Sequence, residues 1–367
     1  MKILGIETSC DETAIAIVNE HREVLSHIVL SQIDIHKEFG GVVPEIAARN
    51  HLDVIDKIIV RTLEKANLTF DDIDAISATS GPGLIGGVMV GMMTAKTLAS
   101  VLKKPFIAVN HLEGHSLVCR LDNCIPFPFL LFLLSGGHCQ ILLAKGVGDY
   151  EKIGGTIDDA LGEAFDKVGQ LMGLEYPAGP KIEKLANNGD ENRFKFPKPL
   201  ISRSGKKKNE AHTYSFSFSG LKTAVRREVE KLTGIDYEYG ESYKKLSEQD
   251  IADICASFQK TAVDVLKNRF ENVVKLLEER GIWNGTVKPK LVISGGVAAN
   301  QYIKENMLKV CEKYGYDLIT PPIKLCTDNG VMIALAGLER MQLGMTDDLD
   351  FNPKARWELT SLTKGNE

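Results

Sequence analysis

One order of predicted elements occurs twice along this chain, and this repetition constrains the fold more than any other feature. In residues 2–109, apolar and alternating runs predict three strands, then a helix, a strand, a helix and a strand. Residues 127–320 again begin with three strands and continue with helices and two further strands. Because a strand, a helix and a further strand form a parallel unit, we expect two α/β halves related by duplication.

Each half opens with two strands joined by a tight turn. The turn is polar at residues 8–13 and glycine-rich at residues 135–138. We expect an N-terminal lobe over 1–117 and a C-terminal lobe over 118–327, with polar insertions near 188–217 and 233–248. A C-terminal helix at about 328–367 is expected to pack back onto the N-terminal lobe.

Composition and charge exclude several classes of protein. The chain has 44% hydrophobic and 25% charged residues, as soluble globular proteins do, and no apolar run of transmembrane length is expected. It begins with a short strand rather than a secretion signal, so we expect a cytoplasmic protein. The 7 cysteines are odd in number and form no C-x-x-C pair, which indicates free thiols. The net charge of -5 argues against a general nucleic-acid coat.

Two histidines follow an apolar strand and share one face of a predicted helix. In His111-Leu112-Glu113-Gly114-His115, a spacing of four residues brings both imidazoles to the same side. This is a metal-ligand spacing, although H-x-E-x-H differs from the H-E-x-x-H of zinc proteases and turns Glu113 away from the histidines. Gly114 indicates that another segment approaches the helix closely. The alternative is a surface helix with two unrelated histidines.

Asp328 is the residue that could complete a metal site. It follows the last predicted strand and precedes a helix, so it is either a helix cap or a third ligand. Two histidines and one carboxylate leave coordination positions open for substrate, which is typical of non-haem Fe²⁺ or Zn²⁺ sites.

Glycine-rich turns supply candidate ligand walls. Residues 81–86 match G-x-G-x-x-G, the pattern of dinucleotide-binding loops. The next strand does not end in the acid that would bind a ribose, so a dinucleotide site is rejected. The segment can still form an anion-facing wall of a ligand site through its backbone N–H groups. The turns at 135–138 and 294–300 suit a phosphate or a nucleoside. Asp159, Glu163 and Asp166 share a helical face that is either exposed to solvent or a cleft wall able to hold ribose hydroxyls.

Seven basic residues and no acid lie between residues 192 and 208. They form either a solvated loop or a contact for the phosphate backbone of a nucleic acid. These candidate RNA-binding residues are Arg193, Lys195, Lys198, Arg203, Lys206, Lys207 and Lys208.

Together these motifs resemble the TsaD family of tRNA threonylcarbamoyladenosine synthases, once described as O-sialoglycoprotein endopeptidases. The resemblance covers nearly the whole chain, and its motifs occur in family order: residues 5–13 (GIETSCDET), 40–45 (GGVVPE), 111–115 (HLEGH), 135–138 (SGGH), 158–167 (DDALGEAFDK), 216–223 (FSFSGLKT), 295–300 (GGVAAN) and 326–330 (CTDNG). The first motif is similar to that of the bacterial and mitochondrial branch. The family implies an α/β fold of the actin/Hsp70/sugar-kinase (ASKHA) type, with two ribonuclease-H-like lobes around a central cleft.

The resemblance also implies a metal-assisted acyl transfer. The threonylcarbamoyl group would move from threonylcarbamoyl-AMP to the N6 amine of adenosine-37, beside the anticodon, in tRNAs that read ANN codons. One divalent metal, Fe²⁺ or alternatively Zn²⁺, is implied at His111, His115 and Asp328. Substrate-binding residues are implied at Leu133, Leu134, Ser135, Gly136, Gly137, Asp166, Gly179 and Asn300. The candidates for handling the proton are Asp11, Glu12 and Glu113.

The implied partners are tRNA, a paralogous TsaB-like subunit and a TsaE-like ATPase, with no membrane. The chain departs from the family at Ala178, where glycine is usual, at Cys139, where threonine is common, and in a longer basic segment near 203–211. Two other functions remain open. A metal-dependent (glyco)protease needs a general base aligned between its ligands, which H-x-E-x-H lacks, and a non-catalytic nucleotide-switch protein of the actin/Hsp70 kind needs no metal site.

Overall fold

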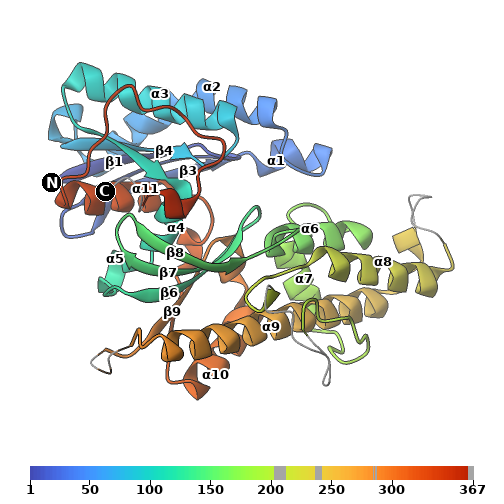
Figure 1. The fold of residues 1–367 in the computed structure, drawn as a ribbon. Helices are drawn as coiled ribbons and strands as arrows, with labels where there is room; N and C mark the ends of the chain where they lie inside the picture. Colours follow the sequence, from blue (N-terminus) through green and yellow to red (C-terminus); the bar gives the residue numbers. More distant parts are fainter. Residues whose placement is uncertain (202–211, 236–241, 284, 286, 363–367) are drawn as a thin grey trace. The chain divides into compact units, whose positions relative to one another are not determined.

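The structure, a computed structural model, describes residues 1–201, 212–235, 242–283, 285 and 287–362 (Figure 1). The chain forms two compact units, and the structure contains two five-stranded sheets. Unit 1 comprises Met1–Pro128, Ala144–Glu151 and Pro321–Glu367, and unit 2 comprises Phe129–Leu143 and Lys152–Thr320.

The sheet of unit 1 has the strand order β3-β2-β1-β4-β5. Its strands are Lys2–Glu7 (β1), Glu12–Asn19 (β2), Val24–Ser31 (β3), Ala75–Gly81 (β4) and Phe106–Asn110 (β5). The first three strands are antiparallel, and β1, β4 and β5 are parallel. Helices α2 (Pro44–Ala66) and α3 (Ile85–Leu102) cover one face of the sheet, and α11 (Gly330–Gln342) covers the other (Figure 1). The short helices are α1 (Ile33–His36), α4 (His111–Leu117) and α5 (Arg120–Asn123).

Alternate residues of β1 enter two separate hydrophobic cores. Ile3 packs with Met332 and Leu335 of α11, whereas Leu4 and Ile6 lie in the core that α2 and α3 complete. Successive side chains of a strand point to opposite faces, and both faces of this sheet are covered by helices. This explains why the strand sequences are continuous apolar runs rather than alternating ones.

Gly5 in β1 allows α11 to lie close to the sheet. A Cβ at this position would lie 2.7 Å from the Cα of Ala334, and the backbone of a packed helix cannot move aside cheaply. We expect Gly5→Ala to lower the free energy of unfolding of unit 1 by roughly 1–3 kcal/mol. Denaturant unfolding followed by Trp357 fluorescence in a Trp283→Phe background would measure this, because each unit contains one of the 2 tryptophans. Equal stability of Gly5→Ala and the matched control Gly146→Ala, whose Cβ has room, would contradict the expectation.

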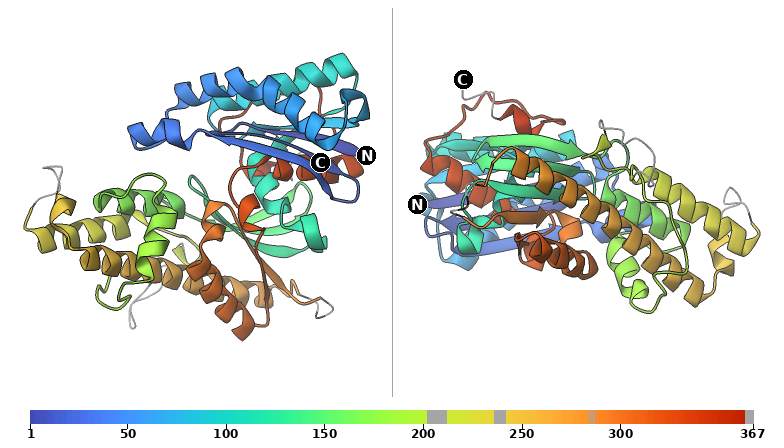
Figure 2. Two further views of the ribbon diagram at one scale, coloured as in Figure 1. Left: turned by 180° about the vertical axis from the view of Figure 1, so that it is seen from behind. Right: turned by 60° about the horizontal axis from the view of Figure 1, so that its bottom comes forward.

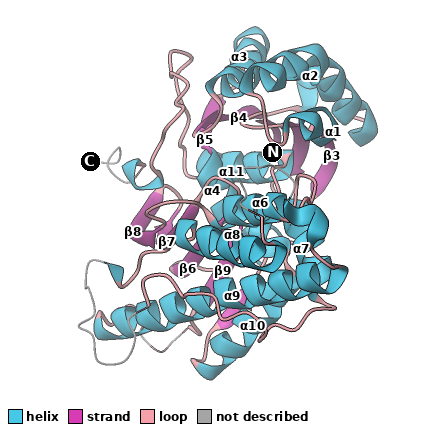
Figure 3. Cartoon of the chain, turned by 90° about the vertical axis from the view of Figure 1, so that its right-hand side faces the viewer, coloured by secondary structure: helices cyan, strands magenta, loops and turns pink. Residues whose placement is uncertain are grey.

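The sheet of unit 2 has the strand order β10-β9-β6-β7-β8 (Figures 1 and 2). Read from the other edge, β8-β7-β6-β9-β10, this order matches that of the first sheet, with β6 in the place of β1. The strands are Phe129–Leu134 (β6), Cys139–Gly146 (β7), Asp149–Gly155 (β8), Lys290–Ser294 (β9) and Asp317–Ile319 (β10). The helices are Leu161–Leu171 (α6), Gly179–Ala186 (α7), Ser219–Thr233 (α8), Glu248–Glu279 (α9) and Gln301–Lys313 (α10), and α9 packs along α7 and α10 (Figure 3). The predicted duplication of an α/β half is therefore confirmed.

The boundaries of the two units differ from the expected division at residues 117 and 327. Unit 1 extends to Pro128 because Arg120 of α5 pairs with Glu339 of α11, with Nε–Oε distances of 2.9 and 3.0 Å. It also includes the turn between β7 and β8, where Val147 packs against the core and the backbone N–H of Gly148 donates to Glu113. The helix expected over 328–367 ends at Gln342, and Asp347 then pairs with Phe106 of β5 and accepts from the backbone N–H of Ala108.

Helix α3 corrects the expectation that no apolar run reaches transmembrane length. Among the described residues, it is the one helix that could cross a membrane by length and composition. It packs on β4 and α2, however, with Gly87, Gly91 and Met92 buried, and this is the arrangement of a core helix.

Candidate metal centre

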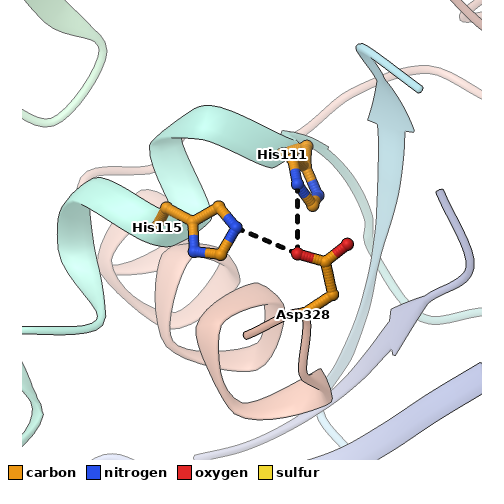
Figure 4. Close-up of side chains that lie close together, drawn as sticks. All are labelled: His111, His115 and Asp328. Atoms are coloured by element: carbon orange, nitrogen blue, oxygen red, sulfur yellow. Dashed lines mark hydrogen bonds and ion pairs between the residues drawn. The ribbon is translucent and has the colours of Figure 1, made fainter. Parts of the chain in front are cut away.

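The two predicted histidine ligands lie at the start of α4, directly after β5. The side chain of Asn110 caps the helix by accepting from the backbone N–H of Leu112, and its amide donates to the backbone oxygen of Trp357. Both imidazoles are buried on one face of α4, and their ring centroids are 4.8 Å apart (Figure 4). The predicted shared face is therefore present.

Asp328 faces these histidines, and another residue caps α11. The side chain of Asn329 accepts from the backbone N–H of Met332 and is the cap. The Oδ1 atom of Asp328 lies 3.0 Å from Nε2 of His115 and 3.5 Å from Nε2 of His111 (Figure 4). The ligand atoms of the three residues lie within 4.8 Å of one another, so the residues present fit a divalent ion with open coordination positions.

Glu7, which the sequence analysis did not single out, stands behind His111. This fully buried carboxylate lies 3.1 Å from Nδ1 of His111 and accepts from the backbone N–H of Ser9 at 2.5 Å and from the hydroxyl of Thr79. Burial lowers the pKa of His111, but Asp328 and Glu7 outweigh it and raise the pKa to about 9. Burial raises the pKa of Glu7, but His111 outweighs it and holds the pKa below the usual range. A carboxylate behind a histidine ligand is a common feature of metal sites.

The turn at residues 8–13 belongs to the same unit as the predicted metal ligands. Burial, followed by the charges of Asp328 and Asp11, raises the pKa of Glu12 well above its usual range. Asp11 is buried. The imidazole of the fully buried His51 holds the turn by contacting the hydroxyl of Thr13 at 2.7 Å and the backbone oxygen of Cys10 at 3.0 Å.

Glu113 lies on the opposite side of α4 from the histidines, as predicted, but has no access to solvent. Its carboxylate accepts from Nε of Arg340 at 2.6 Å, from the backbone N–H of Gly148 at 2.8 Å and from the hydroxyl of Tyr150 at 3.4 Å. These contacts are those of a structural ion pair. We therefore do not retain Glu113 as a candidate for handling the proton.

The glycines at 81–86 pack against other segments of the chain. The backbone N–H of Gly83 donates to the oxygen of Ala355, and that of Leu84 donates to the oxygen of Ser9. A Cβ on Gly83 would lie 2.7 Å from Cβ of Ser9. The amides of Gly83 and Leu84 are therefore already used within the chain, and the anion-facing wall stays a prediction.

The predicted substrate-binding residues all lie in unit 2, most of them at the ends of its strands and helices and Asp166 in the middle of α6. Leu133 and Leu134 end β6, and the Ser135 turn contacts the start of α6, where a Cβ on Gly162 would lie 2.8 Å from the oxygen of Ser135. Asp166 accepts from the backbone N–H of Ala178 at 2.8 Å, and burial raises its pKa.

Asn300 caps α10, and its amide donates to Oε1 of Gln259 at 2.8 Å. A Cβ on Gly295 would lie 2.5 Å from the oxygen of Leu134 and 3.1 Å from the nitrogen of Ser135. The turns at 135–137 and 294–296 are therefore neighbours in space. The two glycine-rich turns that the sequence analysis treated as separate candidate sites therefore lie side by side in unit 2.

Two predicted RNA contacts are occupied by ion pairs within unit 2. Arg193 pairs with Asp250 at 2.5 Å and Asp253 at 2.7 Å, and Lys198 pairs with Asp264 at 2.6 Å. Lys195 is exposed. Arg203, Lys206, Lys207 and Lys208 lie outside the described residues.

Relatives of the chain share one description. A family model described as TsaD: tRNA N6-adenosine threonylcarbamoyltransferase matches residues 23–335. Proteins named tRNA N6-adenosine threonylcarbamoyltransferase from Rhizobium johnstonii and Rickettsia rickettsii are each 50% identical to the chain. The first alignment covers 98% of this chain and 95% of the relative, and the second covers 99% of both.

Solved structures resemble the chain in fold. Full-length HypF in its phosphate- and nucleotide-bound form has a TM-score of 0.55 at 14% identity, covering 93% of this chain and 46% of HypF. Component A of (R)-2-hydroxyglutaryl-CoA dehydratase from Acidaminococcus fermentans has a TM-score of 0.50 at 14% identity, covering 93% and 99%. With the two duplicated sheets, this likeness confirms the expected ASKHA-type fold.

Proposed function

The chain belongs to the TsaD family of tRNA N6-adenosine threonylcarbamoyltransferases, and on this premise we propose that it transfers the threonylcarbamoyl group of threonylcarbamoyl-AMP to N6 of the adenosine beside the anticodon. The substrates are tRNAs that read ANN codons. The observation that carries the proposal is the set of two buried histidines, His111 and His115, and the half-buried carboxylate of Asp328 in a chain 50% identical to such transferases.

The donor is a mixed anhydride with a good leaving group, so binding and orientation can supply much of the rate. His111, His115 and Asp328 hold one divalent ion, Fe²⁺ in preference to Zn²⁺. When bound, this ion polarises the carbonyl of the donor. Residues of unit 2 bind the donor: Leu133, Leu134, Ser135, Gly136, Gly137, Asp166, Gly179 and Asn300. Backbone amides of the glycine turn suit its phosphate.

Acylation of the amine releases a proton, and the turn at residues 8–13 contains the acids that could take it. Burial and the neighbouring carboxylates of Asp328 and Asp11 raise the pKa of Glu12, so its carboxylate holds a proton more readily than an ordinary glutamate. Asp11 and Glu12 are both retained as candidates for taking the proton.

The partners follow from the family resemblance. Among the candidate basic residues that the structure describes, Arg193, Lys195 and Lys198 are all exposed and can contact the tRNA backbone. A TsaB-like subunit and a TsaE-like ATPase act with the chain in the cytoplasm, and a separate enzyme makes the donor.

Transfer of labelled threonine to tRNA in a reconstituted system tests the proposal. We expect label on tRNA only when donor, tRNA and metal-loaded protein are all present. Casein or glycoprotein, incubated with and without chelator, tests the (glyco)protease alternative, for which Glu113 is unavailable as a general base. A protein purified without stoichiometric metal and inactive in transfer would favour the nucleotide-switch alternative.

The affinity of the metal-free protein for a divalent ion is expected to rise with pH. His111 has a pKa of about 9, so it is protonated at neutral pH and must lose the Nε2 proton to act as a ligand. The dissociation constant for Co²⁺ should therefore fall about tenfold per pH unit between pH 7 and pH 8.5. Titration of Co²⁺ absorption in the presence of a competing chelator would measure it. An affinity that is constant over this range would contradict a protonated His111.

A further inference from the structure

We propose that Glu7 is a positioning residue that selects the metal-binding tautomer of His111. A neutral imidazole carries its proton on one nitrogen, and only the bare nitrogen can bind a metal. Nε2 of His111 faces Asp328, and Nδ1 lies 3.1 Å from Oε2 of Glu7. A carboxylate at Nδ1 accepts the Nδ1–H and so leaves the lone pair on Nε2. The inference rests on the proposed function only in taking the site as a metal centre.

The contacts of Glu7 fix which of its oxygens serves His111. The backbone N–H of Ser9 donates to Oε1 at 2.5 Å. The hydroxyl of Thr79 donates to Oε2, the oxygen that also faces Nδ1 of His111. Glu7, Ser9 and Thr79 are all at most 2% exposed, so water does not compete for these positions.

Ser9 is the other group at Nδ1, because its hydroxyl lies 3.1 Å away. A hydroxyl can donate as well as accept, so it does not choose a tautomer by itself. An ionised carboxylate only accepts. The choice of tautomer therefore rests on Glu7.

The variant Glu7→Gln reverses this preference. One oxygen position of the side chain becomes an amide NH₂, and the N–H of Ser9 requires the remaining oxygen on its side. The NH₂ group then faces Nδ1 of His111, which must become the acceptor. The proton moves to Nε2 and blocks the ligand position.

Titration with Co²⁺ at pH 8 tests the proposal without measuring transfer activity. We expect the dissociation constant to rise about 10- to 100-fold in Glu7→Gln, the range typical of groups behind a metal ligand. Glu339→Gln is the matched control, because Glu339 is another buried carboxylate of unit 1 but pairs with Arg120 and Arg22 away from the site. Its dissociation constant should stay within about threefold of that of the unsubstituted protein.

The position of the proton on the His111 ring is a second measurement, and a general loss of packing would not change it. In ¹⁵N-histidine spectra of the metal-free protein above pH 9, His111 should carry its proton on Nδ1, and in Glu7→Gln on Nε2. Glu7→Asp, which keeps the charge, should retain the Nδ1 proton and serves if Glu7→Gln does not fold. An unchanged tautomer in Glu7→Gln, or equal loss of Co²⁺ affinity in Glu339→Gln, would overturn the assignment. A protein inactive in transfer that still shows these shifts would overturn the proposed function and leave this inference standing.

Discussion

Replacement of Asp328 by alanine is expected to remove the metal and at least about 99.9% of the transfer activity, or about 4 kcal/mol of transition-state stabilisation. Asp328 is the carboxylate that both histidines face, at 3.0 and 3.5 Å from their Nε2 atoms. Without it, two neutral imidazoles remain, and the charge of a divalent ion is no longer balanced within the ligand set.

Metal content and transfer would be measured on the same protein. Elemental analysis of Asp328→Ala should find trace metal where the unsubstituted protein has a stoichiometric amount, and labelled threonine should not reach tRNA. Asp350→Ala removes an exposed carboxylate of the same C-terminal segment and should change neither quantity. Circular dichroism would verify that both variants are folded. Full activity in Asp328→Ala would disprove the metal assignment.

The histidine pair shows what sequence spacing can predict. Two residues four apart on a helix must share a face, so the common face of His111 and His115 followed from geometry that the backbone enforces. The role of Asp328 was left open because cap residues and ligands are the same residue types, and the choice depended on Asn329 taking the cap.

Other features depended on packing between segments distant in sequence. Glu7 ends an ordinary buried strand, and the approach of His111 at the start of α4 brings its carboxylate to the predicted metal site. The segment 81–86 matched a phosphate-binding pattern, and its glycines accommodate Ser9 and the C-terminal segment at Lys354. A glycine pattern reports close approach without identifying what approaches. The sequence did contain one signal for Glu7. It is an acid at the end of a strand, and Ser9, a residue type common in turns, follows two positions later.

The second large effect is expected for Glu113, which joins three segments of unit 1. Glu113→Ala should lower the free energy of unfolding of unit 1 by about 3–5 kcal/mol, because it leaves the guanidinium of Arg340 buried without its partner. The Arg340 side chain is 7% exposed, so water cannot readily replace the carboxylate. The backbone N–H of Gly148 loses its acceptor in the same variant. Denaturant unfolding followed by Trp357 fluorescence in a Trp283→Phe background isolates unit 1.

A double-mutant cycle separates the ion pair from the loss of packing. Glu113→Gln and Arg340→Met each leave one buried charged group without its partner, and each should lower the free energy of unfolding by about 3 kcal/mol or more. The double variant buries neither charge, so its cost should be lower than the sum of the single variants by about 1–3 kcal/mol. Additive costs would mean that Glu113 and Arg340 contribute independently.

The position of Glu113 gives this ion pair a consequence for the metal centre. Glu113 lies between His111 and His115 in sequence, and Arg340 lies on α11, the helix that Asp328 precedes. The ion pair therefore fixes α4 against α11, and with them two ligands against the third. Glu113→Gln, studied well below its unfolding transition, should bind Co²⁺ more weakly than the unsubstituted protein but keep the Nδ1 proton on His111. A changed tautomer in that variant would mean that Glu113 acts through Glu7 rather than through the spacing of the helices.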